Sequence, residues 1–523
     1  MRLRPLLVFV AMALFSGRAV TAQDSSPGDA SSVDASGAIE LPEVEVTAES
    51  GNANPNPMQA FQNKMNAMDQ SRDNFLLPKF GATSYTMDRE AIEALPQGDY
   101  TPIDKVLLQA PGVSYDSAVS HPDYHVRNEY ANVQYRINGI LLPEGVSGLG
   151  PVLETGFIGN LNLLDGALRA QYGLRTAGVV DLTTRSEFTP GGSLSLYGGS
   201  FGTVSPSFNY GGSSGETQYF ITGRYMQNNE GLENAMPTLD PIHDHTEQGK
   251  FFGYVSTLLG DSTRLTYMTG TAISQFQIPN VVGQQPLGDF GGTWFNSANL
   301  NENEYDSYVF NILALQTKGA NYDMQLAFFN RYANVHFVPD IYGDLVFNDV
   351  ASNDTRQSLL HGIQFDGAYR LNDQHTLRAG GAISGEETQV TNASTVLPLA
   401  PDGTPLPLPF NVTDYNSKLG GNLGGYIQDE WKITNNLILN TGLRFDQLYQ
   451  FVAANQFSPR VALVYKPFED TSIHAGYARY FTPPMQAAAT STNLALFLAY
   501  PVRCQSRSRV RPVAAVEFFI RGG

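Results

Sequence analysis

Two short stretches of this sequence combine histidine with aspartate, the residue types that could carry metal or chelate chemistry. These residues are His121, Asp123 and His125, and then His243, Asp244 and His245. Imidazole and carboxylate groups together can coordinate a transition metal or contact a metal chelate. Adjacent residues rarely form a complete ligand cage, however, and polar loops also carry such residues for solvation alone. Two interpretations therefore stay open, a substrate-contacting site and a pair of solvated loops.

The sequence holds no arrangement of residues typical of an enzyme. It has no Gly-rich phosphate loop, no His-Glu-x-x-His motif and no nucleophile elbow. Its single cysteine, Cys504, can form no internal disulfide, and no histidine arrangement supports it as a nucleophile. We therefore predict that the protein is not an enzyme, uses no cofactor and holds no resident metal.

The composition favours a β-rich protein. Of the 523 residues only 16% are charged, whereas the chain contains 50 Gly, 26 Tyr and 30 Phe. Aromatic side chains suit pleated surfaces, and glycines suit the turns between strands. The net charge of −18 argues against a nucleic-acid partner, because phosphate binding needs clustered Lys and Arg.

The first 70 residues predict an export signal followed by a flexible segment. Arg2 and Arg4 precede an apolar run at residues 6–15, and small residues precede Gln23, so residues 1–22 resemble a secretory signal peptide cleaved after Ala22. The apolar run is shorter than the roughly 20 residues that span a bilayer.

Residues 23–70 are rich in Ser, Asp, Asn and Pro and are predicted to be flexible. Within them, one β-prone run alternates valine with polar residues: Glu43, Val44, Glu45, Val46, Thr47 and Ala48. A lone extended run between flexible flanks is suited to adding as a strand to a partner's sheet, although a linker without a role has the same composition.

Residues 71–188 predict a compact α+β domain. Short helices are expected at residues 89–95 and 103–109, and strands at residues 133–137, 161–164 and 179–183. Turns are expected at Pro111-Gly112 and Asn138-Gly139.

From about Gly191 the pattern changes to ten-residue segments that alternate apolar and polar residues. In residues 322–331, for example, Tyr322, Met324, Leu326 and Phe328 share one face, opposite polar residues such as Asp323. A strand with one face in lipid and one in a polar lumen needs this alternation.

The connections between these strand segments also favour a transmembrane barrel. Short turns near residues 211–215, 260–262, 318–320, 372–374, 434–436 and 468–470 alternate with long polar loops. The loops are expected at residues 227–249, 274–304, 334–354 and 388–418. Transmembrane barrels have tight periplasmic turns and long extracellular loops, whereas a soluble sandwich has no reason to keep its long loops at one end.

Several motifs now resemble those of TonB-dependent outer-membrane receptors. The first part of the chain carries them at residues 104–113 (DKVLLQAPGV), 126–128 (VRN), 135–139 (YRING) and 166–184 (GALRAQYGLRTAGVVDLTT). The second part carries them at residues 424–431 (GGYIQDEW), 437–446 (LILNTGLRFD), 457–465 (FSPRVALVY) and 477–484 (YARYFTPP). The matches follow the family's order and cover about residues 41–490.

The resemblance implies a membrane all-β fold, an antiparallel transmembrane barrel with an N-terminal plug domain (residues 71–188) in its lumen. Such barrels have about 22 strands, of which about 13 are readable here in residues 189–499. Residues 43–48 stand where the family places its TonB box, so the implied partners are TonB and its inner-membrane energising partners. The remaining implied contacts are outer-membrane lipid and a small extracellular ligand, with the protein a monomer. The segment before the box is too short for an additional N-terminal signalling domain.

The last residues depart from the family pattern. Residues 500–523 form a basic tail in which the alternation stops, whereas family members end on a strand with a terminal aromatic residue. Because a barrel cannot leave sheet edges exposed to lipid, we expect a truncated or frameshifted copy; a short variant that closes differently is the alternative.

The function implied by the resemblance is proton-motive-force-coupled import across the bacterial outer membrane, most often of a ferric siderophore. Cobalamin, haem, a glycan or a peptide are alternative substrates, and a non-functional truncated copy is a further alternative. A passive porin, an adhesin or an outer-membrane enzyme would be a different class of protein, and it would need neither plug nor box.

Overall fold

The computed structural model describes most of the chain after residue 56. The described residues are 57–522 without 79–81, 116–123, 131–132, 143–152, 176, 187, 189, 230–241, 287–294, 398–407, 451, 469–470 and 484–512. The chain divides into two compact units, Met1–Asn54 and Pro55–Gly523, and every described residue belongs to the second. The expected signal peptide (residues 1–22) and the box (residues 43–48) lie outside the described residues.

The plug contains short helices and two small sheets. Its helical elements are α1 (Pro57–Ser71), the π-helix η1 (Arg72–Leu76), α2 (Arg89–Glu93), η2 (Gly98–Tyr100) and α3 (Ile103–Leu107). Its strands are β1 (Thr83–Asp88), β2 (Val113–Tyr115), β3 (Tyr124–Val126), β4 (Glu129–Tyr130), β5 (Val133–Ile137), β6 (Ile140–Leu142), β7 (Ile158–Asp165) and β8 (Gly178–Thr184). One sheet has the order β1-β7-β8-β5-β6, with β5 and β8 parallel, and the other has the order β2-β3-β4.

The plug forms where its sequence predicts a compact domain. Every residue of β5 and of β8 is buried, so these two strands form the centre of the larger sheet. The tight turns come where expected, with positive φ at Gly112, Asn138 and Gly139. Glycine and asparagine tolerate this left-handed conformation better than other residues.

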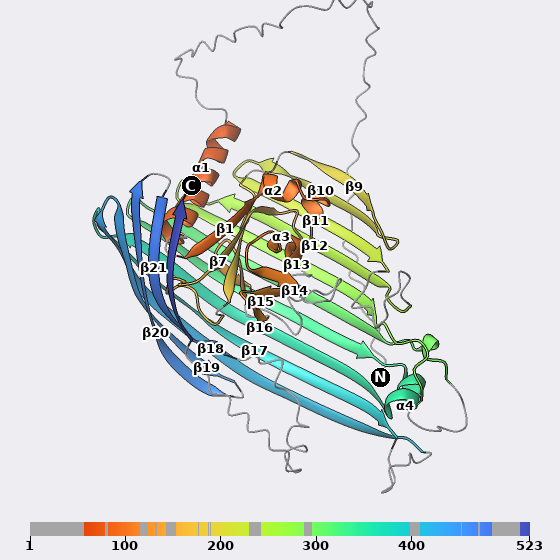
Figure 1. Ribbon diagram of the computed structural model, residues 1–523. Coiled ribbons are helices and arrows are strands. Elements are labelled where there is room, and N and C mark those ends of the chain that lie inside the picture. The colour runs from red at the N-terminus through yellow and green to blue at the C-terminus, as the bar shows by residue number, and fades with distance from the viewer. Residues whose placement is uncertain are drawn as a thin grey trace, which may run out of the picture. The chain divides into compact units, whose positions relative to one another are not determined.

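The second part of the chain forms one antiparallel sheet of fourteen strands in sequence order (Figure 1). They are β9 (Gly191–Gly198), β10 (Val204–Ser214), β11 (Thr217–Asn228), β12 (Thr246–Leu258), β13 (Thr263–Gln277), β14 (Asn303–Lys318), β15 (Tyr322–Val338), β16 (Val350–Arg370), β17 (His375–Val396), β18 (Phe410–Thr434), β19 (Leu437–Tyr449), β20 (Ala453–Phe468), β21 (Thr471–Tyr480) and β22 (Val513–Gly522). The thirteen strands expected before residue 481 are therefore present as β9–β21.

The large sheet is apolar outside and polar inside, the reverse of a soluble sheet. In β15 the side chains of Tyr322, Leu326 and Phe328 are exposed, whereas Asp323 and Arg331 on the opposite face are 0% exposed. An apolar face that no protein covers, opposite a covered polar face, is the arrangement of a strand between lipid and a lumen. None of the helices among the described residues has the length and apolar character needed to cross a membrane.

The strands are connected alternately by tight turns and by longer loops, as expected. The prediction of a loop at residues 388–418, however, is wrong. Residues 388–418 are largely strand: β17 and β18 continue to Val396 and from Phe410, and pair along this whole stretch. Thr, Asn and Ser in these strands prolong the hairpin beyond the roughly ten residues that a membrane requires. The loop after β15 contains the helix α4 (Ile341–Asn348), and the loop after β13 contains η3 (Ser297–Asn299).

Two further segments correct the sequence predictions. Residues 57–70 were expected to be flexible, yet they form α1, in which Phe61, Met65 and Met68 recur at helical spacing and are buried. The tail expected at residues 500–523 includes β22, which pairs antiparallel with β21. Its sequence (VAAVEFFIRG) is rich in the valine, phenylalanine and isoleucine that favour strands.

Candidate functional site

The predicted histidine clusters do not meet in one place among the described residues. His121 and Asp123 lie outside these residues, and His125 lies in β3, opposite Ser114 and Tyr130 in the neighbouring strands. The described part of the chain contains no group of three or more His, Cys, Asp or Glu placed to hold a metal ion.

The second cluster joins the connections between strands. The His243 Nε2 atom lies 2.9 Å from the carbonyl oxygen of Ala298, in the next long loop. The His245 Nδ1 atom lies 2.9 Å from Asn229 Oδ1, and its backbone N–H donates to Gln277. These contacts hold the loops after β11 and after β13 together, which is a structural task for at least two of the three residues.

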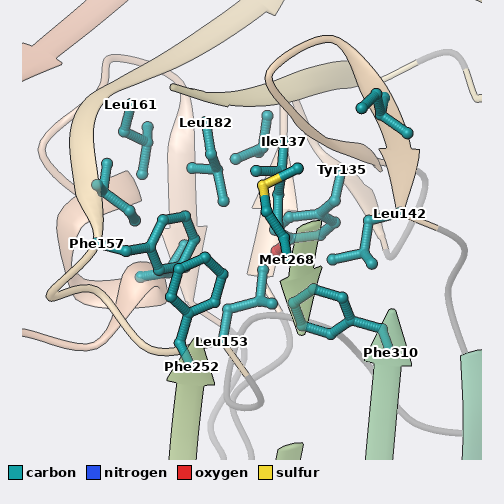
Figure 2. Packing of buried hydrophobic residues seen from close by; sticks show 14 of the residues in the cluster. Tyr135, Ile137, Leu142, Leu153, Phe157, Leu161, Leu182, Phe252, Met268 and Phe310 are labelled. Atoms are coloured by element: carbon teal, nitrogen blue, oxygen red, sulfur yellow. The ribbon is translucent and has the colours of Figure 1, made fainter. Parts of the chain in front are cut away.

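Polar and apolar contacts join the plug to the large sheet. On the side of β11–β16 these contacts include a large apolar and aromatic cluster, besides hydrogen bonds from Gln325 and Gln364 to the carbonyl oxygens of Asn138 and Gly139. Phe157 of the plug stacks on Phe252 of β12 with ring centroids 3.8 Å apart, and Phe188 stacks on Phe220 of β11 at 4.6 Å. Figure 2 shows Phe252, Met268 and Phe310 of the sheet pointing into the plug core beside Leu153 and Phe157. Packing of this kind excludes water and fixes one wall of the plug.

On the side of β18–β21 polar side chains of the sheet are directed at the plug backbone, and Leu168 and Tyr172 also pack against Ala478 and Tyr480. They converge on residues 166–173, which we call the anchor turn. Arg460 of β20 donates to the carbonyl oxygens of Leu168 (2.7 Å) and Tyr172 (3.1 Å). Arg444 of β19 lies at the limit of hydrogen-bond distance, 3.4 Å, from two further carbonyls of the turn.

Backbone N–H groups of the anchor turn are also hydrogen-bonded to side chains of the sheet. The backbone N–H of Ala170 donates to Gln428 Oε1 (3.1 Å), and that of Leu168 donates to the hydroxyl of Tyr480 (2.7 Å). The Tyr480 hydroxyl in turn donates to the carbonyl oxygen of Gly166. Because buried backbone groups must be paired, these bonds make the turn and the sheet complementary.

A buried ion network adds charge to this interface. Arg169 of the anchor turn and Arg378 of β17 both contact Glu430 of β18, at 3.2 Å and 3.1 Å. Burial lowers the pKa of the Arg169 guanidinium, and the charge of Glu430 opposes that shift. A plug arginine that lost Glu430 would be a buried unpaired charge, so the network favours one docked position of the plug.

Close packing explains one glycine of the anchor turn. A Cβ atom added at Gly173 would lie 2.1 Å from Arg444 Nε, so any side chain would displace the arginine. The Gly173 carbonyl accepts a hydrogen bond of 2.6 Å from Gln134 of β5.

The sequence alone does not predict these interface residues as a site. Arg444 and Arg460 stand on the polar faces of their strands and within the family-like motifs, which was the available signal. The sequence does not show which plug residues these arginines contact, because Arg460 and its partner Leu168 are 292 positions apart in the chain.

This fold and interface define a class of protein: a membrane-type antiparallel sheet, apolar outside, whose polar face holds a separate α+β plug. Residues 237–506, slightly more than half of the chain, match the family model "TonB dependent receptor-like, beta-barrel". The chain therefore belongs to the TonB-dependent receptor family, whose members are outer-membrane transporters and receptors and not enzymes.

Solved structures with the same fold are receptors of this type. The ferric citrate transporter FecA matches with a TM-score of 0.60 at 13% identity, over 84% of this chain and 67% of that one. The pyoverdine outer-membrane receptor FpvA of Pseudomonas aeruginosa matches with a TM-score of 0.57 at 18% identity, over 78% of this chain and 63% of that one. At these identities the likeness shows the fold alone.

A curated relative, the TonB-dependent transporter Oar of Myxococcus xanthus, is 35% identical over 69 residues. The match covers 11% of this chain and 6% of that protein. A chain of the FpvAI–pyocin S2 complex matches with a TM-score of 0.58 at 19% identity, over 78% of this chain and 56% of that one, so this chain spans somewhat more than half the length of that solved relative.

Proposed function

We propose that this chain serves in TonB-dependent import of a scarce ligand across the outer membrane, and that the ligand is a ferric siderophore. The observation that carries the proposal is the plug's attachment to the polar face of the sheet by non-covalent, backbone-directed bonds. A passive pore gains nothing from a separate domain in its lumen, whereas a transporter needs one that can hold the pathway closed and then move.

The ligand class rests on the structural neighbours. Their names state ferric citrate, pyoverdine and ferric yersiniabactin as the ligands of FecA, FpvA and the Yersinia pestis receptor FyuA. Under this proposal His121, Asp123, His125 and the second cluster (residues 243–245) are candidate ligand contacts on the extracellular side. Asp244 is the most buried of the second cluster, at 2% exposure, which makes His245 the better first target for substitution.

Energy coupling is assigned to residues 43–48, as the strand that pairs with TonB. Backbone pairing suits this task, because a row of main-chain hydrogen bonds can bear a pull without requiring a particular side chain. Export is assigned to residues 1–22, so N-terminal sequencing of the protein from outer membranes should begin at Gln23.

The test uses cells that produce the chain and lack other iron receptors. Iron-55 complexes of pyoverdine, citrate and yersiniabactin are supplied, and surface binding in the cold is measured separately from accumulation at growth temperature. Deletion of residues 43–48 should abolish accumulation and spare binding. A matched control deletes residues 29–34, which removes the same number of residues from the same N-terminal segment and should leave both measurements unchanged. Accumulation that survives loss of residues 43–48 contradicts the energy-coupled function.

A further inference from the structure

A histidine and an aspartate lie beside a tryptophan on the outer side of the sheet, on the neighbouring strands β17 and β18. The His375 Nδ1 atom lies 2.9 Å from Asp429 Oδ2, and the two side chains are 30% and 29% exposed. The His375 ring stacks on Trp431, with ring centroids 5.5 Å apart and an angle of 17° between the planes. We call these three side chains, His375, Asp429 and Trp431, the outer cluster.

The alternation of β18 places Asp429 on the face that is turned toward lipid. Its neighbour Glu430 is buried and contacts the plug, whereas Ile427 and Trp431, two residues to either side of Asp429, are 59% and 38% exposed. Successive side chains of a strand point to opposite faces, so Asp429 shares the outer face with these two. Other apolar side chains exposed on the outer face of β17, β18 and β19 are Leu377, Ile383, Leu423 and Leu443. The outer cluster is therefore a polar site within an apolar surface.

The outer cluster stands at the periplasmic boundary of this apolar surface. β16 ends at Arg370 and β17 begins at His375, so a tight turn joins them, of the kind that transmembrane barrels have on their periplasmic side. Trp431 lies directly opposite His375 in the register of the two strands. Tryptophan is enriched where a membrane protein crosses the level of the lipid headgroups. The outer cluster therefore meets headgroups of the periplasmic leaflet.

The chemistry of the outer cluster suits an organic ammonium group. Asp429 supplies a negative charge, and its Oδ1 atom has no hydrogen-bond partner among the residues that the structure describes. A neutral His375 that donates from Nδ1 to Asp429 carries a hydrogen-bond acceptor at Nε2. The indole of Trp431 attracts cations to its face more strongly than the other aromatic rings do. A carboxylate that faces lipid is costly, so such a residue commonly has a specific partner.

Among phospholipids, one headgroup matches all three side chains. Phosphatidylethanolamine ends in a primary ammonium group, which carries a positive charge and three N–H donors. Phosphatidylcholine carries the charge but no N–H donor, and phosphatidylglycerol carries no cation. Only the first can place its charge beside Asp429 and Trp431 and also donate a hydrogen bond to His375.

We propose that the outer cluster binds the ammonium headgroup of a phosphatidylethanolamine molecule in the periplasmic leaflet. The bound lipid joins β17 to β18 from outside and fixes the depth of this hairpin in the membrane. The site faces away from the plug, so it depends neither on the imported ligand nor on TonB.

The experiment uses the tryptophan of the site as its own reporter. The chain contains two tryptophans, Trp294 and Trp431, so Trp294→Phe leaves Trp431 as the single indole fluorophore. This full chain is reconstituted into phosphatidylcholine vesicles that contain increasing fractions of a phospholipid with brominated acyl chains, which quench an indole on contact. Brominated phosphatidylethanolamine, phosphatidylcholine and phosphatidylglycerol are compared.

Phosphatidylethanolamine should quench Trp431 at about a tenfold lower fraction than phosphatidylglycerol, since a charge-assisted hydrogen bond contributes at least about this factor. Phosphatidylcholine should fall between them. Identical quenching curves for the three brominated lipids would overturn the proposal.

Matched variants, each made in the Trp294→Phe chain, assign the preference to the outer cluster. Asp429→Asn removes the charge at constant size and should abolish most of the preference for phosphatidylethanolamine over phosphatidylglycerol. Asp373→Asn, the same change at an exposed position of the turn before β17, should keep it. His375→Phe keeps a ring against Trp431 but removes Nε2, so it should reduce the preference for phosphatidylethanolamine over phosphatidylcholine.

An unchanged preference in Asp429→Asn, or an equal loss in Asp373→Asn, contradicts the site. Circular dichroism shows whether each variant keeps its strands. If a variant loses them, the comparison of the three lipids in the Trp294→Phe chain decides alone, because that chain retains the whole outer cluster.

Discussion

Replacing Arg460 tests whether bonds from the sheet to the anchor turn hold the plug in place. Arg460→Met keeps the bulk of the stem but removes the donors to the carbonyls of Leu168 and Tyr172. A hydrogen bond to a charged group contributes about 1.5–3 kcal/mol, and the carbonyls would stay buried without a donor. Removing the buried arginine also removes its own desolvation cost, so we expect a net loss of about 2–4 kcal/mol of docking free energy.

This loss corresponds to roughly a 30- to 700-fold higher population of the undocked anchor turn, since 1.4 kcal/mol is a factor of ten. Amide hydrogen exchange in detergent micelles measures it directly at Ala170, whose N–H donates to Gln428. The exchange rate at Ala170 in Arg460→Lys should fall between the rates of the unchanged protein and of Arg460→Met, because an ammonium group cannot reproduce the guanidinium fork.

The control for Arg460→Met is the same change at Arg356, an arginine of β16 that is 53% exposed and pairs only at the surface with Asp354. Its effect on exchange at Ala170 should stay within about 0.5 kcal/mol, as for most surface substitutions. If Arg460→Met leaves the protection of Ala170 as unchanged as Arg356→Met does, the anchor turn is not held by these bonds.

Three further changes test other parts of the structure. Gly173→Ala places a Cβ 2.1 Å from Arg444 Nε, so exchange at the anchor turn should accelerate at least as much as in Arg460→Met; wild-type exchange would refute the close packing. Leu326→Arg puts a charge on the outer face and should destabilise the sheet by about 2–4 kcal/mol in lipid, measured by urea unfolding from vesicles, whereas an unchanged midpoint would deny that this face meets lipid. Burial, aided by a hydrogen bond with Asp344, raises the pKa of Glu302 to about 8. The folded carboxyl therefore keeps a proton that the unfolded one loses near pH 4, and the stabilisation of this loop contact is lost as the pH rises through about 8. Spin labels on the loops after β13 and β15 should separate above that pH, and not in Glu302→Gln.

The strands could be predicted because each carries its own pattern. The alternation of apolar and polar residues in β15 is visible in the sequence alone. It gives the two faces of the strand in the structure, where Tyr322 is exposed and Asp323 is buried. The buried strand β5 and the turn at Asn138-Gly139 were also local signals, and they appear where expected.

The helix α1 and the anchor turn could not be predicted in the same way. The apolar spacing of Phe61, Met65 and Met68 was present, but the many Asn, Gln and Pro around it concealed a face that becomes apolar core only against Leu258. The anchor turn depends on the sheet reaching it from the far end of the chain, and no local pattern states which carbonyl a distant arginine will meet.

The chemistry of the histidine clusters also could not be derived from sequence spacing. His243 has a positive φ and contacts Ala298, whereas His245 contacts Asn229. The local backbone conformation therefore determines which residue each histidine side chain contacts. Proximity in sequence placed the two residues in one motif, while the backbone gave their side chains different partners.

Energised accumulation is the most direct test of the central claim, that a docked plug makes import depend on a pull. Cells producing the chain are loaded with whichever of the three iron-55 complexes binds, and initial uptake is compared before and after a protonophore collapses the proton gradient. We expect uptake to fall to the rate of cells without the chain, while surface binding is unchanged. Uptake that continues at its original rate without the gradient would contradict it.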